Sequence, residues 1–224
     1  MASVLAEDQQ ESTVADLLER LGDIPASRVR LHPPPGQATE RDVLEIHART
    51  DRLFELIDGV LVEKAMGFRE SFLAVRIIMI LGEFVERHRL GIVTGADGML
   101  RLSARNVRIP DVAFVSWNQL PTRKVPTKPI PDLFPDLAIE VLSESNTRRE
   151  MDRKREDYFR AGTRLIWQFN PERRIVEVYA AGRKPKVMDS TQKLDGGKVL
   201  PGFELSLAEL FGSLDEQGPP AKRG

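Results

Sequence analysis

Three acidic residues lie in or beside apolar segments, where a free carboxylate is costly. Glu55 and Glu140 each interrupt an apolar run, and Asp111 directly follows Pro110 at the start of another. An unpaired buried carboxylate costs several kcal/mol, so each must face solvent, pair with a cation or ligate a metal. A hard cation such as Mg²⁺ takes oxygen ligands, usually one or two carboxylates completed by water and substrate phosphate. Asp111 and Glu140 could supply these ligands, and a metal there would activate a water and neutralise a scissile phosphate, which is the chemistry of phosphodiester hydrolysis.

Lys154 adds a cation to this set. In a predicted helix over residues 148–161, Lys154 shares one face with Met151, Tyr158 and Ala161, because these positions follow helical spacing. A lysine on such a stripe requires an anionic partner, and the carboxylates of the adjoining strands are the obvious candidates. Its ammonium group can orient an attacking water or stabilise the charge that develops on a phosphate.

Each of these residues also has a purely structural interpretation. Glu55 could face solvent from an edge strand, since strand acids are usually exposed, and Asp111 could cap a turn after the proline. Lys154 could extend along the helix flank to water, the common arrangement for a single lysine. Glu140 is the hardest to explain in this way, because apolar residues flank it on both sides.

Turn and capping signals define the elements that would position these side chains. Asp58-Gly59 supplies the positive φ angles of a tight turn and predicts a hairpin of strands 53–57 and 60–62. Residues 147–150 have the pattern of a capping box, in which Glu150 is the capping acid, and Gly162 ends the helix that they open. A long, largely buried helix over 70–88 is predicted from apolar residues at helical spacing, namely Phe72, Val75, Ile78, Met79, Phe84 and Val85.

The remaining signals predict an α/β (mixed α+β) fold. Short capped helices are expected at 14–21 and 40–49, and further strands at 92–94, 99–102, 112–115, 137–142, 165–169 and 175–179. These elements form a central mixed β-sheet flanked by helices, with the 70–88 helix on one side and the 148–161 helix on the other. The domain would span 38–212, after a peripheral helix and proline-rich linker (1–37) and before a flexible tail (213–224).

Composition is that of a soluble globular protein. The 224 residues are 41% hydrophobic and 30% charged, which excludes a largely disordered chain. Cysteine is absent, so disulfides, thiolate zinc sites and cysteine nucleophiles are excluded, and the cytoplasm is the expected compartment. The acidic start, residues 1–11, is not a secretory signal, and the longest central apolar run, 77–81, is too short for a membrane span.

Charge is balanced overall but uneven along the chain. The formal net charge of −1 excludes a general polyanion binder. Between Arg101 and Lys128, however, six basic residues accompany one acid, a local balance of 6 − 1 = +5. This segment is either a solvated basic loop or a surface on which Arg101, Arg105 and Arg108 touch a nucleic-acid backbone.

Four segments together resemble a known family. They are 54–59 (Phe-Glu-Leu-Ile-Asp-Gly), 109–112 (Ile-Pro-Asp-Val), 135–143 (Pro-Asp-Leu-Ala-Ile-Glu-Val-Leu-Ser), and Lys154 with 158–162 (Tyr-Phe-Arg-Ala-Gly). In this order they resemble the Uma family of predicted restriction endonucleases, which belongs to the PD-(D/E)XK nuclease superfamily. The resemblance covers roughly residues 38–212, including Leu-Pro-Gly-Phe at 200–203, and implies a restriction-endonuclease-like core.

The resemblance also implies roles for individual residues. Asp111 matches the acid of the PD half-motif, Glu140 the acid of the (D/E)XK half-motif, and Glu55 an upstream acid. Leu142 departs from the pattern, because it stands two residues after Glu140, where the superfamily has lysine. The Uma pattern places a lysine on the following helix, which implies that Lys154 takes that role.

We therefore predict a Mg²⁺- or Mn²⁺-dependent endonuclease that acts on nucleic acid, and we expect the substrate to be DNA. Asp111, Glu140 and Glu55 would hold the metal, and Lys154 would position the water. A homodimer is a further hypothesis, by analogy with enzymes that cut duplexes as two-fold dimers. Two alternatives stay open. One is a catalytically inactive nuclease-fold module that binds nucleic acid or a protein partner, which Leu142 favours; the other is a metal-free hydrolase using paired carboxylates.

Overall fold

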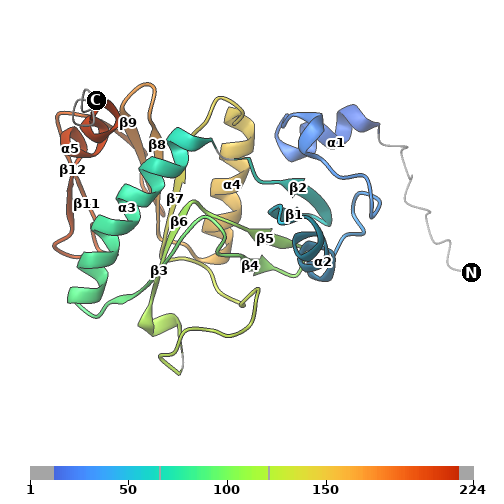
Figure 1. Cartoon of the computed structure of the whole chain (residues 1–224), viewed down its shortest axis with the longest axis horizontal. Helices are drawn as coiled ribbons and strands as arrows, with labels where there is room; N and C mark the ends of the chain where they lie inside the picture. The colour runs from blue at the N-terminus through green and yellow to red at the C-terminus, as the bar shows by residue number, and fades with distance from the viewer. Residues whose placement is uncertain (1–12, 66, 121, 217–224) are drawn as a thin grey trace, which may run out of the picture.

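The protein is built around a six-stranded mixed sheet (Figure 1). The computed structural model describes residues 13–65, 67–120 and 122–216. The strand order is β10-β9-β8-β7-β6-β3, and only β7 and β8 are parallel among these neighbours. Its strands are β3 (Gly91–Thr94), β6 (Val112–Ser116), β7 (Leu137–Val141), β8 (Leu165–Asn170), β9 (Ile175–Ala180) and β10 (Lys186–Asp189). The predicted central mixed sheet is confirmed.

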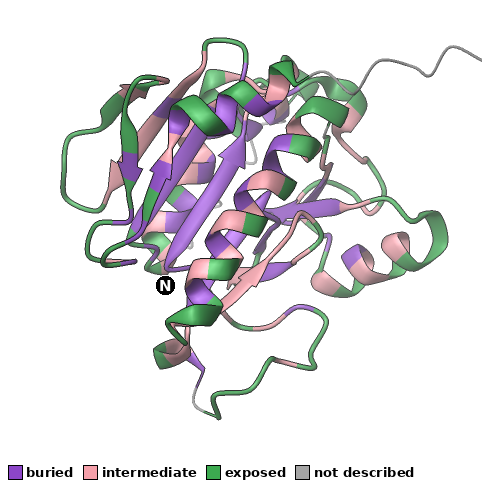
Figure 2. Cartoon of the chain, turned by 60° about the vertical axis from the view of Figure 1, so that its left-hand side comes forward, coloured by how far each residue is buried: buried purple, intermediate pink, exposed green. Residues whose placement is uncertain are grey.

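Two helices cover opposite faces of this sheet. The parallel pair β7 and β8 is joined by α4 (Arg148–Ala161), as a parallel connection requires a crossover. Leu137, Ile139 and the other odd-numbered residues of β7 pack in the same apolar core as α3 (Phe68–Arg87). Ala138, which points the other way, packs with Tyr158 of α4. Figure 2 shows α3 lying across the buried strands.

The long helix α3 is present, but its buried face differs from the predicted one. The side chains that enter the core are Leu73, Ala74, Ile77, Leu81 and Val85. By contrast, three of the residues predicted to be buried are exposed: Phe72 by 37%, Val75 by 50% and Met79 by 58%. Apolar residues occupy more than one face of this helix, so helical spacing alone could not select the face that packs.

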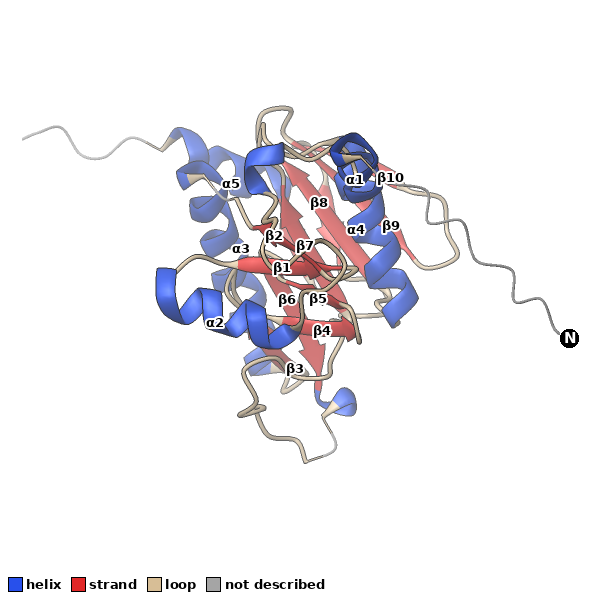
Figure 3. Ribbon diagram, turned by 90° about the vertical axis from the view of Figure 1, so that its right-hand side faces the viewer, coloured by secondary structure: helices blue, strands red, loops and turns tan. Residues whose placement is uncertain are grey.

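A smaller four-stranded sheet, in the order β2-β1-β5-β4, stands beside the central sheet (Figure 3). Its strands are β1 (Phe54–Ile57), β2 (Val60–Glu63), β4 (Leu100–Ser103) and β5 (Asn106–Arg108). The predicted hairpin is confirmed, with φ of 49° at Asp58 and 78° at Gly59. The sequence pattern did not predict β5, which has three residues.

Helices at the N-terminal end cover this small sheet. Val43 of α2 (Glu40–Thr50) packs with Phe54 and Leu56 of β1. Helix α1 (Val14–Leu21) places Leu17 and Leu21 against the β1–β2 hairpin. Both predicted N-terminal helices, α1 and α2, are therefore present. Two short 3-10 helices also occur: η1 (Ala26–Arg28) follows α1, and η2 (Trp117–Gln119) follows β6.

The C-terminal segment closes the α3 side of the core. It contains β11 (Lys193–Asp195), β12 (Glu204–Ser206) and α5 (Leu207–Gly212), whose Leu207, Leu210 and Phe211 are buried. The tail predicted to begin at residue 213 starts instead with a 3-10 helix, η3 (Ser213–Asp215). Residues 217–224 of that predicted tail, and the acidic start at 1–11, lie outside the described residues. No helix of the described residues is long and apolar enough for a membrane crossing.

Candidate active site

Hydrogen bonds place two of the predicted acids near each other. Asp111 directly precedes β6, and its carboxylate accepts from the amide of Val141, the residue after Glu140, at 2.7 Å. The Asp111 amide donates to the Ile139 carbonyl of β7 at 3.1 Å. Glu140 lies on the face of β7 that α4 covers, because it shares this face with Ala138. Asp111 therefore lies beside Glu140, close to the helix that carries Lys154.

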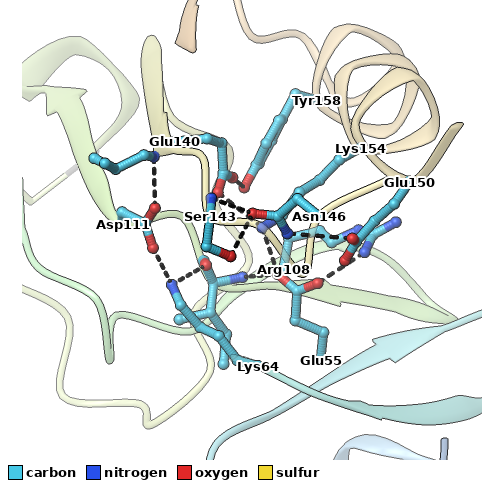
Figure 4. Close-up of polar contacts among 12 residues, drawn as sticks. Glu55, Lys64, Arg108, Asp111, Glu140, Ser143, Asn146, Glu150, Lys154 and Tyr158 are labelled. Atoms are coloured by element: carbon cyan, nitrogen blue, oxygen red, sulfur yellow. Dashed lines mark hydrogen bonds and ion pairs between the residues drawn. The ribbon is translucent and has the colours of Figure 1, made fainter. Parts of the chain in front are cut away.

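Both oxygens of Glu140 contact side chains of α4 (Figure 4). The Lys154 Nζ lies 2.9 Å from Glu140 Oε2, and the Tyr158 hydroxyl donates to Glu140 Oε1 at 2.7 Å. Lys154 and Tyr158 are four residues apart and so project from one side of the helix. The sequence prediction that Lys154 points inward to the strand carboxylates is confirmed, and the alternative in which it extends to water is excluded.

Asp111 is held by a residue that the sequence analysis did not identify. Its Oδ1 lies 2.8 Å from the Nζ of Lys64, and its Oδ2 accepts from the Val141 amide at 2.7 Å. Lys64 follows β2 directly and also donates to the Ile109 carbonyl at 2.6 Å. The only signal for Lys64 in the sequence is its position after the apolar run of β2, which does not reveal its partner.

Glu55 is linked to Glu140 through Lys154, and these buried acids and cations form one ion network. The Oε2 of Glu55 lies 2.8 Å from Arg108, while its Oε1 accepts from the Ile109 amide at 2.9 Å and lies 3.2 Å from Lys154. Arg108 also contacts Asp157 of α4 at 2.5 Å. Glu55 is only 3% exposed. The interpretation of Glu55 as a solvent-facing strand acid is therefore excluded, because both of its oxygens are bound by buried cations.

The network gives its acids and its lysine different protonation behaviour. Burial raises the pKa of Glu140 to about 7; Lys154 opposes this shift and Asp111 reinforces it. Burial also favours the acid form of Glu55, but Lys154, Arg108 and the Ile109 amide outweigh it and hold its pKa at about 2. Burial alone would lower the pKa of Lys154, yet Glu140, Glu55 and Asp111 together raise it above its usual value. Lys154 is therefore a stable cation at neutral pH.

Two of the three arginines predicted to touch nucleic acid are at least partly exposed, but their guanidinium groups bind other groups of the protein. Arg101 pairs with Glu40 and approaches Asp132 at 3.5 Å. Arg105 donates to the Gly36 carbonyl at 2.8 Å and to the Asp58 carbonyl at 2.7 Å.

Arg108 is 1% exposed, between Glu55 and Asp157. Glu55 and Asp157 already bind its guanidinium group, so the structure does not support a contact between Arg108 and a nucleic-acid backbone. Its role is internal, since it neutralises two acids. This arrangement was not predictable from the local basic charge of residues 101–128.

The donor set of Asp111 and Glu140 fits a hard divalent cation. Mg²⁺ commonly uses one or two carboxylates as protein ligands, and each oxygen of these two carboxylates has a second lone pair beyond the contact described above. If all groups are ionised, the four acids Glu55, Asp111, Glu140 and Asp157 and the four cations Lys64, Arg108, Lys154 and Arg160 sum to −4 + 4 = 0. The network therefore has no excess positive charge that would repel a cation.

Glu55, the third predicted metal ligand, is bound by Arg108, Lys154 and the Ile109 amide. Among the described residues, no three acidic or histidine side chains gather as a metal-binding group. The arrangement thus gives no support to a three-acid metal site, and the metal role of Glu55 stays a prediction.

Comparison with known proteins identifies the family. A model of the Uma2 family, which is described as "Putative restriction endonuclease", matches residues 40–208. The chain belongs to the Uma2 family. No protein of curated function matches it. A crystal structure described as "a putative nuclease belonging to DUF820 from Anabaena variabilis" superposes with a TM-score of 0.66 at 20% identity, covering 74% of this chain and 93% of that one. This likeness shows that the two proteins share a fold.

The Uma2 match contains the whole ion network. Glu55, Lys64, Asp111, Glu140 and Lys154 all lie within residues 40–208, whereas α1 and η1 precede the matched segment. The resemblance inferred from the ordered segments of the sequence is thus confirmed at the level of family. Leu142 stands two residues after Glu140, and the ammonium group that contacts Glu140 comes from Lys154 of α4.

Proposed function

We propose that the protein is an endonuclease that hydrolyses phosphodiester bonds of nucleic acid, with DNA as the preferred substrate, and that it requires Mg²⁺ or Mn²⁺. One observation carries this proposal: the Asp111 carboxylate is bound to the Val141 amide next to Glu140, and the Lys154 ammonium lies 2.9 Å from Glu140. Membership of the Uma2 family, with its nuclease description, supports the reaction class.

Asp111 and Glu140 would hold the cation. Bound there, it would supply a water of lowered pKa and neutralise charge on the scissile phosphate. Lys154 stays protonated and so acts as a cation that orients the water and stabilises developing negative charge, not as a general base. Tyr158 fixes one oxygen of Glu140, and Lys64 fixes one oxygen of Asp111.

Glu55 and Arg108 are positioning residues in this proposal. Glu55 holds Lys154 from the side opposite Glu140, at 3.2 Å, and Arg108 holds Glu55 at 2.8 Å. The ammonium is therefore fixed between two carboxylates on separate sheets. This role replaces that of metal ligand for Glu55.

The test is a cleavage assay on purified protein. Duplex DNA, single-stranded DNA and RNA would each be incubated with Mg²⁺, Mn²⁺ or a chelator. We expect cleavage only with metal, and we expect Asp111→Asn and Glu140→Gln to lower kcat by roughly 10²–10³-fold or more. The matched control is Glu86→Gln, which neutralises an exposed acid on α3 and should cleave like the wild type.

Two results would replace the proposal with another function. Binding of nucleic acid without cleavage under any metal condition would identify a binding module, the alternative that Leu142 favours. Cleavage that survives the chelator and depends on Asp111 and Glu140 would identify a metal-free hydrolase. Cleavage that is undiminished in both variants would show that the activity belongs to another site or to a contaminant.

A homodimer remains part of this proposal by analogy, since cutting both strands of a duplex is commonly the work of two active sites. Light scattering on the purified chain, alone and with duplex DNA, tests it. A monomer under both conditions would remove the dimer and leave the chemistry at each site unaffected.

A further inference from the structure

A cleft lies beside the candidate active site on the α4 side of the central sheet, because Gln168, which lines it, is the register partner of Glu140. Its volume is about 460 Å³, and it is lined by the start of α4, by β8 and β9, and by the segment that follows β7. Leu142 and Ser143, which follow Glu140 in the chain by two and three residues, belong to this lining. A nucleic-acid strand whose scissile phosphate lay at Glu140 would thus have room for its next nucleotide here.

Strand register connects the floor of this cleft to the active site. Glu140 of β7 lies opposite Gln168 of β8, and Gln168 lies opposite Glu177 of β9. Residues paired in this way point to one face. A polar row therefore runs across three strands, from Glu140 to the far wall of the cleft.

Gln168 is an unusual member of this row, because its amide nitrogen has no partner. The residue is 2% exposed and lines the cleft. Its Oε1 accepts from Arg155 at 3.3 Å, whereas its Nε2 has no hydrogen-bond partner among the described residues. A buried donor without a partner costs about 1–3 kcal/mol, so it is expected to be satisfied by something outside the protein chain.

The walls of the cleft carry three arginines and two acids, a balance of 3 − 2 = +1. Arg148 and Arg173 are exposed, and within the described part of the chain neither guanidinium group pairs with a carboxylate. Arg155 is held differently: its guanidinium stacks 4.2 Å from the Tyr179 ring centroid and contacts Asp152 at 2.5 Å. Two arginines are thus available for a ligand, while a third is fixed and orients Gln168.

We propose that this cleft is a subsite for one nucleotide of the substrate strand, adjacent to the scissile bond. Arg148 and Arg173 contact the phosphate of that nucleotide, and the Gln168 amide donates its free hydrogens to an acceptor on the base. This proposal rests on the proposed nuclease function. It replaces the 101–108 arginines with Arg148 and Arg173 as the residues that meet the backbone, because the former are bonded within the protein and the latter are not.

Binding measurements without cleavage test the subsite directly. Fluorescence anisotropy with short fluorescein-labelled single-stranded DNA, duplex DNA and RNA, in the presence of chelator, gives Kd at several salt concentrations. We expect the double variant Arg148→Ala/Arg173→Ala to weaken binding at least tenfold and to reduce the salt slope by about 1, because the two arginines share one phosphate. The matched control Arg123→Ala removes an exposed arginine outside the cleft and should bind like the wild type.

Gln168 variants separate base recognition from charge. Gln168→Leu should weaken binding about fivefold with the salt slope unchanged, because it removes a neutral donor. Gln168→Glu should weaken it further, since it places a carboxylate where the strand runs. In cleavage assays with Mg²⁺, both should raise KM more than they lower kcat.

The outcomes distinguish the two proposals. Cleavage by the wild type with Kd and KM unchanged in the arginine double variant and in Gln168→Leu would overturn the subsite and leave the nuclease function intact. Absence of both binding and cleavage for every probe would overturn the subsite together with the nuclease function. Equal weakening by Arg123→Ala would show diffuse electrostatic attraction and would also overturn the subsite.

Discussion

The two faces of strands β7 and β8 have opposite chemical character although the same strands form both. Toward α3 these strands present Ile139, Trp167 and Phe169, which are fully buried in the largest apolar core. Toward α4 they present Glu140 and Gln168, which are as well buried but polar, beside the apolar Ala138 and Ile166. Alternation along a strand is what allows this division, because successive side chains point to opposite faces.

The α3 face contributes mainly to stability, and the α4 face carries the groups of the proposed chemistry. The α3 face gains free energy from apolar burial, whereas the α4 face contains a buried ion network that is costly to assemble and disruptive to break. Stability alone does not account for the α4 face, because a well-packed apolar replacement of a buried ion network is often at least as stable. Mutations on the α3 face should therefore change the free energy of unfolding alone, whereas mutations on the α4 face should also change cleavage.

The largest expected effect is that of Lys154→Met on the polar face. It leaves Glu140 and Glu55 buried without their shared cation, so we expect a loss of about 3–5 kcal/mol in the free energy of unfolding together with loss of cleavage. Urea denaturation and the cleavage assay measure the two effects. Adding Glu140→Gln to Lys154→Met should recover part of the stability but none of the activity.

Lys198→Met is the control for this experiment, because Lys198 is exposed and lies in the C-terminal segment between β11 and β12. It should change neither quantity. A Lys154→Met protein that keeps wild-type cleavage would remove Lys154 from the mechanism and leave the division between the two faces without its main support.

On the apolar face, Phe169→Ala should lower stability without a catalytic effect. Truncating this fully buried ring costs about 3–5 kcal/mol through lost burial and the cavity that remains. The variant should retain near wild-type kcat per folded molecule at a temperature where it is folded. Phe68→Ala is the matched control, since Phe68 is 92% exposed and should change stability by less than about 0.5 kcal/mol. A selective fall in kcat for Phe169→Ala would contradict the separation of roles.

The two faces should also respond differently to pH, because only the polar face titrates. The pKa of Glu140 is raised from 4.5 to about 7 in the folded protein. The folded state therefore holds this proton more tightly, so the stability that Glu140 contributes is complete below pH 4.5 and is lost as pH rises through 7. Relative to Glu140→Gln, the wild type should lose about 2 kcal/mol of unfolding free energy between pH 5 and 8.

Urea denaturation of both proteins at pH 5, 6, 7 and 8 measures this difference. Glu55 does not interfere, because its pKa of about 2 places the loss of its contribution at much lower pH. The difference between the two proteins should also shrink when Mg²⁺ is added at pH 8, since a cation beside Glu140 stabilises its ionised form. Parallel pH curves for the two proteins would show that Glu140 is ionised throughout.

Local signals in the sequence predicted most of the fold. Asp58-Gly59 specified the β1–β2 turn, and Thr147 and Gly162 set the ends of α4, because each acts on its immediate neighbours. The buried face of α3 could not be read from spacing, since Phe72 and Met79 fit a helical stripe as well as Leu73 does. The capping box at α4 was half right: Thr147 accepts from the Glu150 amide, but the Glu150 carboxylate pairs with Arg28.

The candidate site was predictable only where an unusual residue type revealed it. Glu140 stands out in an apolar strand, and Lys154 stands out on a helix stripe. Their partners did not, because pairing joins residues far apart in the chain: Lys64 meets Asp111 and Arg108 meets Asp157. Arg108 illustrates the limit, since its sequence context is basic and its actual environment is two buried acids.

The smallest expected effect concerns Arg105, one of the arginines first considered for nucleic acid. Arg105→Ala removes hydrogen bonds to the Gly36 and Asp58 carbonyls, which tie the loop before α2 to the β1–β2 turn, and should cost about 1 kcal/mol of unfolding free energy. Because this guanidinium group is used within the protein, we expect the Kd for DNA and its salt slope to stay unchanged. Anisotropy titrations beside the Arg148→Ala/Arg173→Ala variant measure both quantities. A salt slope reduced by about 1 in Arg105→Ala would mean that Arg105 exchanges its carbonyl partners for a phosphate. The contacts with the nucleic-acid backbone would then extend to the small sheet as well.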